Sequence, residues 1–155
     1  MTKVLFGERI GKAGKLRLGC SAAIFNQNRD KILLTKRSDN GQWCLPGGAM
    51  EPGESAEECC QREVNEETGL EVSPVRLVGV YSNPDQLVVY PDDNRVQVVV
   101  LHFEAQITGG QLGLSDETTE AGYFTLDEIE DMTLLGRHKE RIKDTLAGQM
   151  SAFIR

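Results

Sequence analysis

Apolar residues recur along the chain with two different spacings, and the change between them divides the sequence into elements. Residues 18 to 26 and 31 to 36 are apolar segments on either side of the polar stretch QNRD, which predicts two strands joined by a hairpin turn. Residues 70 to 82 and 95 to 107 are rich in Val, Leu and aromatic residues and are separated by the turn-like YPDDN. They predict two more strands, and residues 121 to 126 predict a short one.

The clearest helix signals lie in the middle of the chain, over residues 55 to 68. Ser55 followed three positions later by Glu58 forms a capping box, and Gly69 stands where a helix commonly stops. The sequence therefore predicts both ends of this helix.

Two shorter helices are expected near the C-terminus. The segment TLDEIEDM begins with Thr125 as a candidate N-cap, and residues 134 to 147 have amphipathic spacing that ends at Gly148. Strands outnumber helices, and helices follow strands in an order that predicts an α/β or α+β domain in which helices cover a twisted sheet.

Length and charge narrow the possible functions. The 155 residues suggest a single domain spanning residues 1 to 155. The formal net charge of −7 argues against a broad basic surface for the backbone of a nucleic acid, so a small nucleotide or a metal-bridged ligand fits better. No segment has the roughly 18 apolar residues of a membrane span. The first 20 residues also contain no continuous apolar stretch of the kind found in a signal peptide. A cytoplasmic protein that binds neither membrane nor nucleic acid is the expectation.

The cysteines give little support to a zinc site, because no C-x-x-C pair occurs and imidazole partners are few. We expect reduced cysteines that pack as small apolar residues, and we assign no chemistry to the histidines. The residues concerned are Cys20, Cys44, Cys59, Cys60, His102 and His138.

The central helix carries an unusual cluster of acidic residues. At about 100° per residue, positions 56, 59, 60, 63, 66 and 67 share a sector of roughly 120°, the face that a core would cover. The first half of this face is apolar, but the second half consists of Glu63, Glu66 and Glu67. Like charges at this spacing destabilise a helix, so a cation is expected, and Mg²⁺ prefers such oxygen ligands. The alternative is a solvated acidic face.

A glycine-rich segment, LPGGAMEPGE, precedes this helix. Gly47, Gly48 and Gly53 allow the backbone to approach a metal or a phosphate closely. From Gly48 onward the sequence matches the Nudix box, G-x5-E-x7-R-E-U-x-E-E-x-G-U with U apolar, at every fixed position through Leu70. By average composition such a match would arise by chance on the order of once in ten million sequences of this length.

The chain therefore resembles the Nudix hydrolase family, and the resemblance extends from the hairpin before the box to the C-terminal helix. It implies a mixed β-sheet between helices, an α/β/α sandwich. It also implies hydrolysis of a nucleoside diphosphate linked to another group, with Mg²⁺ or Mn²⁺ as cofactor. A homodimer is an expectation from analogy alone.

The resemblance also implies roles for individual box residues. Glu66 and Glu67 resemble the principal metal ligands, and Glu63 resembles a glutamate that binds metal or acts as base. The carbonyl of Gly47 resembles a further metal ligand. Arg62 resembles the residue that, paired with the box glutamate Glu54, braces the loop against the helix.

Candidate residues outside the box are less sharply defined. Glu117 and Glu120 lie in the loop SDETTEAGYF, where relatives often recruit a further metal ligand or base; an exposed acidic loop is the alternative. Trp43 could stack on a nucleobase or pack in the fold. Lys36, Arg37 and the backbone at Gly48 could contact substrate phosphates, although exposure without a role is the alternative for the two basic side chains. These residues complete the predicted site.

Two rival functions stay open. Some Nudix domains sense a nucleotide or bind a partner without catalysis, but such domains commonly lose box residues, and this sequence keeps them all. An RNA-processing hydrolase is disfavoured by the net charge. The identity of the substrate does not follow from the sequence.

Overall fold

The computed structural model describes residues 1–155. Its strands are β1 (Lys3–Phe6), β2 (Lys15–Ile24), β3 (Ile32–Arg37), β4 (Trp43–Cys44), β5 (Gly47–Ala49), β6 (Leu70–Tyr81), β7 (Gln86–Val89), β8 (Arg95–Gly110), β9 (Thr118–Phe124) and β10 (Phe153–Ile154). Its helices are α1 (Ala56–Thr68), α2 (Leu126–Asp131) and α3 (His138–Leu146), with a 3₁₀ turn η1 (Ile10–Ala13).

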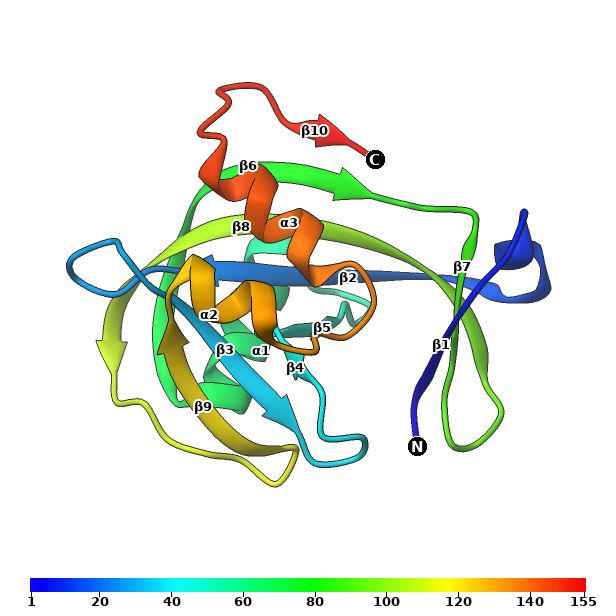
Figure 1. Cartoon of the computed structure of the whole chain (residues 1–155), viewed down its shortest axis with the longest axis horizontal. Helices are drawn as coiled ribbons and strands as arrows, with labels where there is room; N and C mark the ends of the chain where they lie inside the picture. The colour runs from blue at the N-terminus through cyan, green and yellow to red at the C-terminus, as the bar shows by residue number, and fades with distance from the viewer.

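A mixed sheet of seven strands forms the centre of the molecule (Figure 1). Strands β2 and β8 run parallel, and β8 also pairs antiparallel with β6 and β7. The free edge of β2 pairs antiparallel with the short β5, which belongs to the glycine-rich segment. Strands β4, β3 and β9 form a second, smaller sheet.

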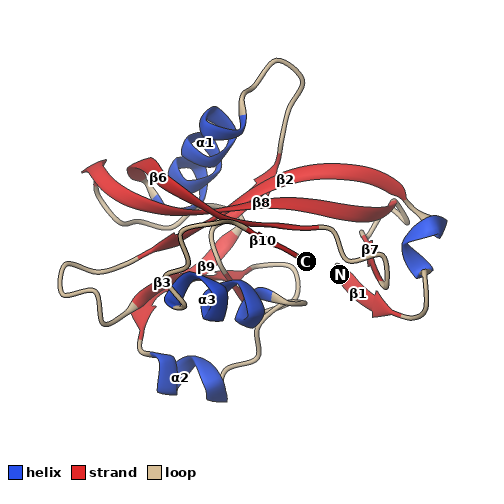
Figure 2. Ribbon diagram, turned by 90° about the horizontal axis from the view of Figure 1, so that it is seen from above, coloured by secondary structure: helices blue, strands red, loops and turns tan.

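The helices lie on opposite sides of the large sheet. Figure 2 shows α1 on one side of β2 and β8, and α3 on the other side with α2 beyond it. The predicted arrangement of a mixed sheet between helices is confirmed. None of the helices has the length and apolarity that a membrane crossing requires.

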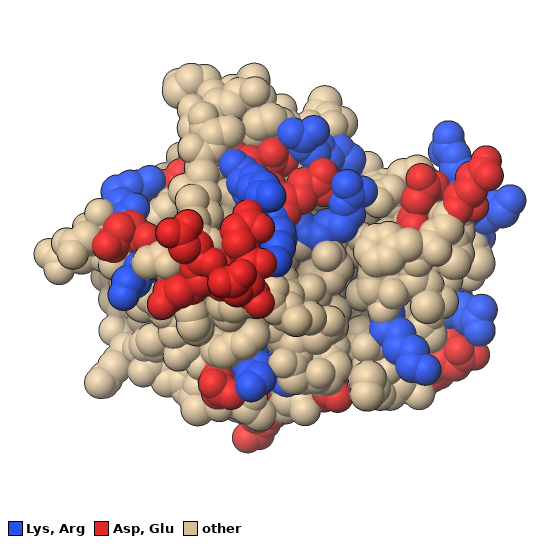
Figure 3. Space-filling view, in the orientation of Figure 1, with Lys and Arg blue, Asp and Glu red and all other residues tan.

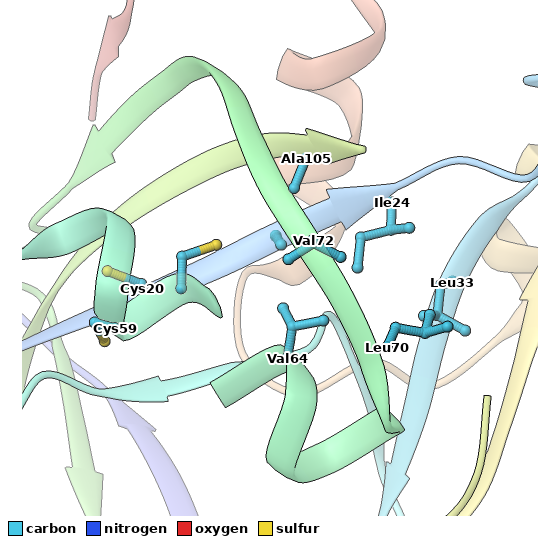
Figure 4. Packing of buried hydrophobic residues seen from close by; sticks show 10 residues of the cluster. Cys20, Ile24, Leu33, Cys59, Val64, Leu70, Val72 and Ala105 are labelled. Atoms are coloured by element: carbon cyan, nitrogen blue, oxygen red, sulfur yellow. The ribbon is translucent and has the colours of Figure 1, made fainter. Parts of the chain in front are cut away.

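Two apolar clusters hold these layers together because side chains of β2 alternate between the faces of the sheet. One cluster joins α1 to the sheet and is shown in Figure 4; it includes Cys59 and Val64 of α1 packed with Ile24. The other includes Ala23 of β2 and Ile142 of α3. All four cysteines are free and buried, as expected from the sequence.

The ends of α1 are as predicted. The Ser55 side chain accepts from the amide of Glu58, and the Glu58 side chain accepts from the amide of Ser55. Gly69 has φ 75°, a left-handed conformation that favours glycine. Thr125 caps α2 in the same way as Ser55 caps α1. The residues at which the central helix begins and ends are therefore set by local sequence.

The third helix begins later than predicted, at His138 instead of residue 134. Residues 133 to 135 pair with the backbone of Trp43: the amide of Trp43 donates to Thr133 and the amide of Leu135 donates to Trp43. Gly136 then has φ 52°, which a right-handed helix cannot include. Pairing across the fold has replaced the first turn of the expected helix.

Two other expectations are corrected by the structure, and three short strands were not predicted. The first two predicted strands are not a regular hairpin, since they belong to different sheets. They pair only beside the turn, through the bridge between Phe25 and Ile32 and the hydrogen bond from the amide of Asn26 to the carbonyl of Lys31. The glycine-rich segment is not wholly a loop, because residues 47 to 49 form β5. The strands β1, β7 and β10 carry no strong sequence signal; each has only two to four residues and is held by pairing with a longer neighbour or with each other.

Candidate active site

The last two turns of α1 face β5, and this contact places the box glutamates against the glycine-rich segment. The amide of Gly47 donates to Oε2 of Glu67 at 3.2 Å. Gly48 lies directly over the carboxylate of Glu63, so closely that a Cβ at this position would overlap its oxygen atoms. The absence of a side chain at residue 48 is therefore what gives Glu63 its place.

Glu67 is a buried carboxylate without a cationic partner. Only 9% of its surface is exposed, and its side chain forms no salt bridge. Burial raises its pKa to about 8, and the charges of Glu63 and Glu117 add to this effect, while the hydrogen bond from Gly47 and the charge of Arg37 act against it. The ionised form of this carboxyl group therefore requires a neutralising group, either a proton or a cation.

Arg62 holds the remaining box glutamates. Its guanidinium contacts both oxygens of Glu54, and its Nη1 donates to Glu63 at 2.9 Å and to Glu66 at 3.1 Å. Its Nη2 also donates to the carbonyl of Ala49 in β5 at 3.0 Å. The expected pairing of Arg62 with Glu54 is present, and it connects the helix, the loop and the strand.

The three glutamates in the second half of α1, Glu63, Glu66 and Glu67, differ in exposure. The side chain of Glu66 is 60% exposed, whereas that of Glu63 is 14% exposed and Glu67 is buried. The expectation that all three lie on the covered face is therefore wrong for Glu66. The covered stripe continues instead through Val64 and Thr68.

Of the two loop glutamates, the structure brings Glu117 to the cluster. Its charge raises the pKa of both Glu63 and Glu67. The loop is fixed there because the Thr118 hydroxyl donates to the carbonyl of Glu67 at 3.2 Å. Glu120 instead accepts from Lys36 at 2.6 Å.

The acidic cluster offers the type of ligand atom that a hard divalent cation prefers, although no three acidic, histidine or cysteine side chains converge on one point. The cluster offers only oxygen donors, and its carboxylates outnumber the single cation, Arg62, that contacts them. The cluster comprises Glu54, Glu63, Glu66, Glu67 and Glu117. The orphaned charge of Glu67 lies at its most buried point. These are the features that a Mg²⁺ ion would satisfy.

A cavity opens beside this cluster, along β5 and β2. Arg37 and Gly48, two of the residues predicted to contact substrate, line it together with Gly47. Its walls contain four arginines and no carboxylate, a strong local excess of positive charge in an acidic protein. Figure 3 shows basic side chains gathered on the face of the molecule near α3, next to acidic ones.

Lys36 and Trp43 lie outside the lining of this cavity. The indole of Trp43 packs edge-on against Phe124 with ring centroids 4.9 Å apart, and Nζ of Lys36 lies 5.7 Å from the indole centroid. These contacts favour the packing role for Trp43 over stacking on a nucleobase.

Sequence reasoning missed three of the four cavity arginines, Arg17, Arg137 and Arg141. Arg141 had a readable signal, because it shares the buried face of α3 with Ile142 and Thr145. A charged residue on a covered helix face was the observation that identified the glutamates of α1, and it applied equally to α3.

The histidines have structural roles. The Thr145 hydroxyl donates to the carbonyl of Arg141 at 2.8 Å, so it accepts from Nε2 of His102, 3.0 Å away. Nδ1 of His102 then accepts from Ser21, 2.8 Å away. In a similar manner His138 accepts from the amide of Leu45 through Nδ1. Neither histidine contacts the acidic cluster, although His138 lines the cavity.

Comparison with known proteins agrees with this geometry. The NUDIX domain family profile matches residues 15–147. An ADP-ribose pyrophosphatase of Methanocaldococcus jannaschii is 36% identical over 154 aligned residues, which cover 90% of this chain and 86% of that protein. A putative 8-oxo-dGTP diphosphatase of Bacillus subtilis is 39% identical over 104 residues, 67% of this chain and 62% of that protein.

Solved structures show the same fold. The crystal structure of an ADP-ribose pyrophosphatase from Streptococcus suis superimposes with a TM-score of 0.68 at 29% identity, over 90% of this chain and 97% of that one. A MutT protein from Methanosarcina mazei gives 0.69 at 26% identity, over 88% and 97% of the two chains. With a complete box, the matching fold and these relatives, the chain is an enzyme of the Nudix hydrolase family.

Proposed function

We propose that the protein is a Mg²⁺-dependent pyrophosphohydrolase that cleaves a nucleoside diphosphate linked to another group, with Mn²⁺ as a substitute metal. The observation that carries the proposal is the orphaned, buried charge of Glu67 inside an acidic cluster, beside a cavity lined by arginines. A phosphate-bearing substrate bridged by a divalent cation would neutralise both groups.

The relatives suggest two kinds of substrate. One similar protein is named an ADP-ribose pyrophosphatase and another a putative 8-oxo-dGTP diphosphatase. ADP-ribose or a related nucleotide sugar, and nucleoside triphosphates, are therefore the substrates to test first.

Glu63, Glu66 and Glu67 would hold the metal, together with Glu117 and the carbonyl of Gly47. When bound, the metal neutralises phosphoryl charge and lowers the pKa of an attacking water. Arg62 donates through Nη1 to both Glu63 and Glu66 and so would orient their carboxylates for the metal.

The proton of the attacking water needs a carboxylate acceptor. Glu63 is mostly covered and is held by Arg62, and Glu117 is exposed at the mouth of the same cluster. Glu120 is occupied by Lys36. Glu63 and Glu117 are therefore the preferred candidates for the base, ahead of Glu120.

Arg37 would contact the substrate from the cavity side. Its guanidinium is fixed by a two-point contact with Asp39, at 2.8 and 3.1 Å, and it lines the cavity together with Gly47 and Gly48. A fixed guanidinium next to open backbone is suited to phosphate oxygens.

The test is a substrate panel with Mg²⁺ and with Mn²⁺, followed by identification of the products. ADP-ribose, nucleotide sugars, nucleoside triphosphates and capped RNA are compared. Glu66→Gln and Glu67→Gln are expected to lower turnover of the best substrate by about 100-fold or more, whereas Glu57→Gln, on an exposed turn of the same helix, retains it. Normal turnover in both box variants would contradict the metal assignment. Nucleotide binding by calorimetry without any hydrolysis would favour a sensing domain.

A further inference from the structure

Arg141 of α3 is a buried cation without a carboxylate partner. Only 7% of its surface is exposed, and it forms no salt bridge. Its Nε has no hydrogen-bond partner, and its one polar contact runs from Nη1 to the Ser21 hydroxyl at 3.3 Å. Burial lowers the pKa of Arg141 to about 10, so the group is still charged at neutral pH.

The neighbouring carboxylate is not available to neutralise Arg141. Asp144, one turn along α3, accepts from the Tyr81 hydroxyl at 2.8 Å and pairs with Arg155 through both oxygens. Tyr81 presents its ring to Arg141 at 5.8 Å, which is a weaker compensation than an anion. The burial of Arg141 therefore costs free energy that the Ser21 hydroxyl, the Tyr81 ring and the nearby charge of Glu140 offset only in part.

The position of the guanidinium is fixed by a closed chain of hydrogen bonds. Arg141 donates to Ser21, Ser21 donates to His102, and His102 donates to Thr145, which donates back to the carbonyl of Arg141. The guanidinium is therefore preorganised for a ligand in the cavity, because its side chain loses little conformational entropy on binding.

Arg141 is also distinct from the other arginines of the cavity. Arg37 is paired with Asp39, and Arg137 is paired with Glu140 at 2.9 Å. Arg17 lies over the ring of Tyr90, 5.3 Å from its centroid, at the exposed side. Arg141 is thus the one buried, unneutralised positive charge that lines the cavity.

We propose that Arg141 binds a phosphate group of the substrate that is not part of the bond being cleaved. This inference rests on the proposed function and adds a substrate class to it: nucleotides that carry a further phosphate. The acidic cluster supports the separation of the two sites, since none of its glutamates lines the cavity, and only the backbone of β5 borders both.

A first experiment measures binding without turnover. Inorganic phosphate is titrated into metal-free protein, and binding is followed by calorimetry and by the rise in melting temperature. We expect Arg141→Gln to weaken binding by about tenfold or more, and Arg141→Lys to fall between it and the wild type. Arg95→Gln, which removes an exposed arginine outside the cavity, is the matched control and should bind as the wild type does. Equal binding by all four proteins would overturn the proposal.

A second experiment uses the wild type, so that it does not depend on how well a variant folds. ADP-ribose is compared with ADP-ribose 2′-phosphate, and a nucleoside diphosphate is compared with its triphosphate. A KM lower by about tenfold for the 2′-phosphorylated compound would show that the phosphate bound by Arg141 is on the ribose. The same decrease in KM for the triphosphate would show that this phosphate is at the end of the polyphosphate. No gain in either pair would overturn the proposal.

The two experiments separate this inference from the hydrolase function. Arg141-dependent phosphate binding in a protein that hydrolyses nothing would support the subsite and contradict the proposed function. Hydrolysis with phosphate binding that is insensitive to residue 141 would do the reverse. The lower KM that the added phosphate gives in the second experiment should disappear in Arg141→Gln and remain in Arg95→Gln.

Discussion

The amide of Gly47 donates to the carboxylate of Glu67 across 3.2 Å, and this is the only hydrogen bond that the buried Glu67 side chain receives. One neutral donor only partly compensates a buried negative charge, since a carboxylate can accept about four hydrogen bonds. The contact ties the glycine-rich strand to α1, yet leaves the charge in need of a cation.

Replacing Glu67 by Gln should separate stability from metal binding. In EDTA, the free energy of unfolding of Glu67→Gln is expected to equal that of the wild type or to be about 1 kcal/mol higher. Gln keeps the shape of the side chain but removes the cost of burying or protonating a carboxyl group whose pKa burial raises to about 8. The stabilisation that Mg²⁺ gives the wild type should be reduced in the variant. Urea unfolding with and without Mg²⁺ measures both effects, with Glu57→Gln as the control on the same helix.

A variant that is destabilised in EDTA by several kcal/mol would show that Glu67 has a structural partner. That outcome would remove the main physical argument for a cation at this position.

Arg62 and Glu54 should act as one unit. Their side chains make a two-point contact, so Arg62→Lys and Glu54→Gln are each expected to lower kcat/KM by about 10- to 100-fold through loss of orientation of the metal-binding glutamates. The double variant should be little worse than either single one, with a coupling energy of about 1–3 kcal/mol. Fully additive losses would mean that the pair does not brace the site.

Gly48 offers a test that addresses Glu63 with little effect on the fold. The backbone at Gly48 is accessible to other residues, but an added Cβ would overlap the Glu63 carboxylate. Gly48→Ala should therefore displace that carboxylate and lower kcat by about 10-fold or more, at a cost in stability of about 1 kcal/mol. The free energy of unfolding and kcat are measured together.

Gly113 provides the matched control, since a Cβ there meets open space and its φ is not positive. Gly113→Ala should leave both quantities nearly unchanged. A fully active Gly48→Ala variant would argue against a role for the position of Glu63.

His102 should make folding depend on pH. The side chain is fully buried, and burial, with the charge of Arg141, lowers its pKa well below 6.5. The unfolded chain therefore binds a proton below about pH 6.5 that the folded protein does not, so this residue contributes stability above that pH which is lost as the pH falls. The contribution should decline by about 1.4 kcal/mol per pH unit.

The difference between wild type and His102→Gln isolates this effect, because other titrating groups are common to both proteins. Gln keeps one acceptor and one donor for the neighbours Ser21 and Thr145. Between pH 6.5 and 5.5 the stability of the variant should fall less steeply than that of the wild type. Parallel curves would show that the imidazole is protonated in the folded state.

The sequence by itself determined the elements whose signals are local. Both ends of α1 follow from Ser55, Glu58 and Gly69, because capping bonds join residues three to four positions apart. The family also follows from the spacing of the box residues between Gly48 and Leu70. These features depend on contacts that a linear pattern records directly.

Only the tertiary structure decided which charged groups are covered and which meet. Glu66 and Glu67 are neighbours on α1, but β5 covers one and leaves the other exposed. The pairing of β9 with β3 likewise places Glu120 beside Lys36, whereas Glu117 precedes β9 and lies near the acidic cluster. Arg141 enters the cavity because α3 packs against β2, 120 residues earlier in the chain. Burial is set by what an element packs against, and helical or strand periodicity carries no record of that partner.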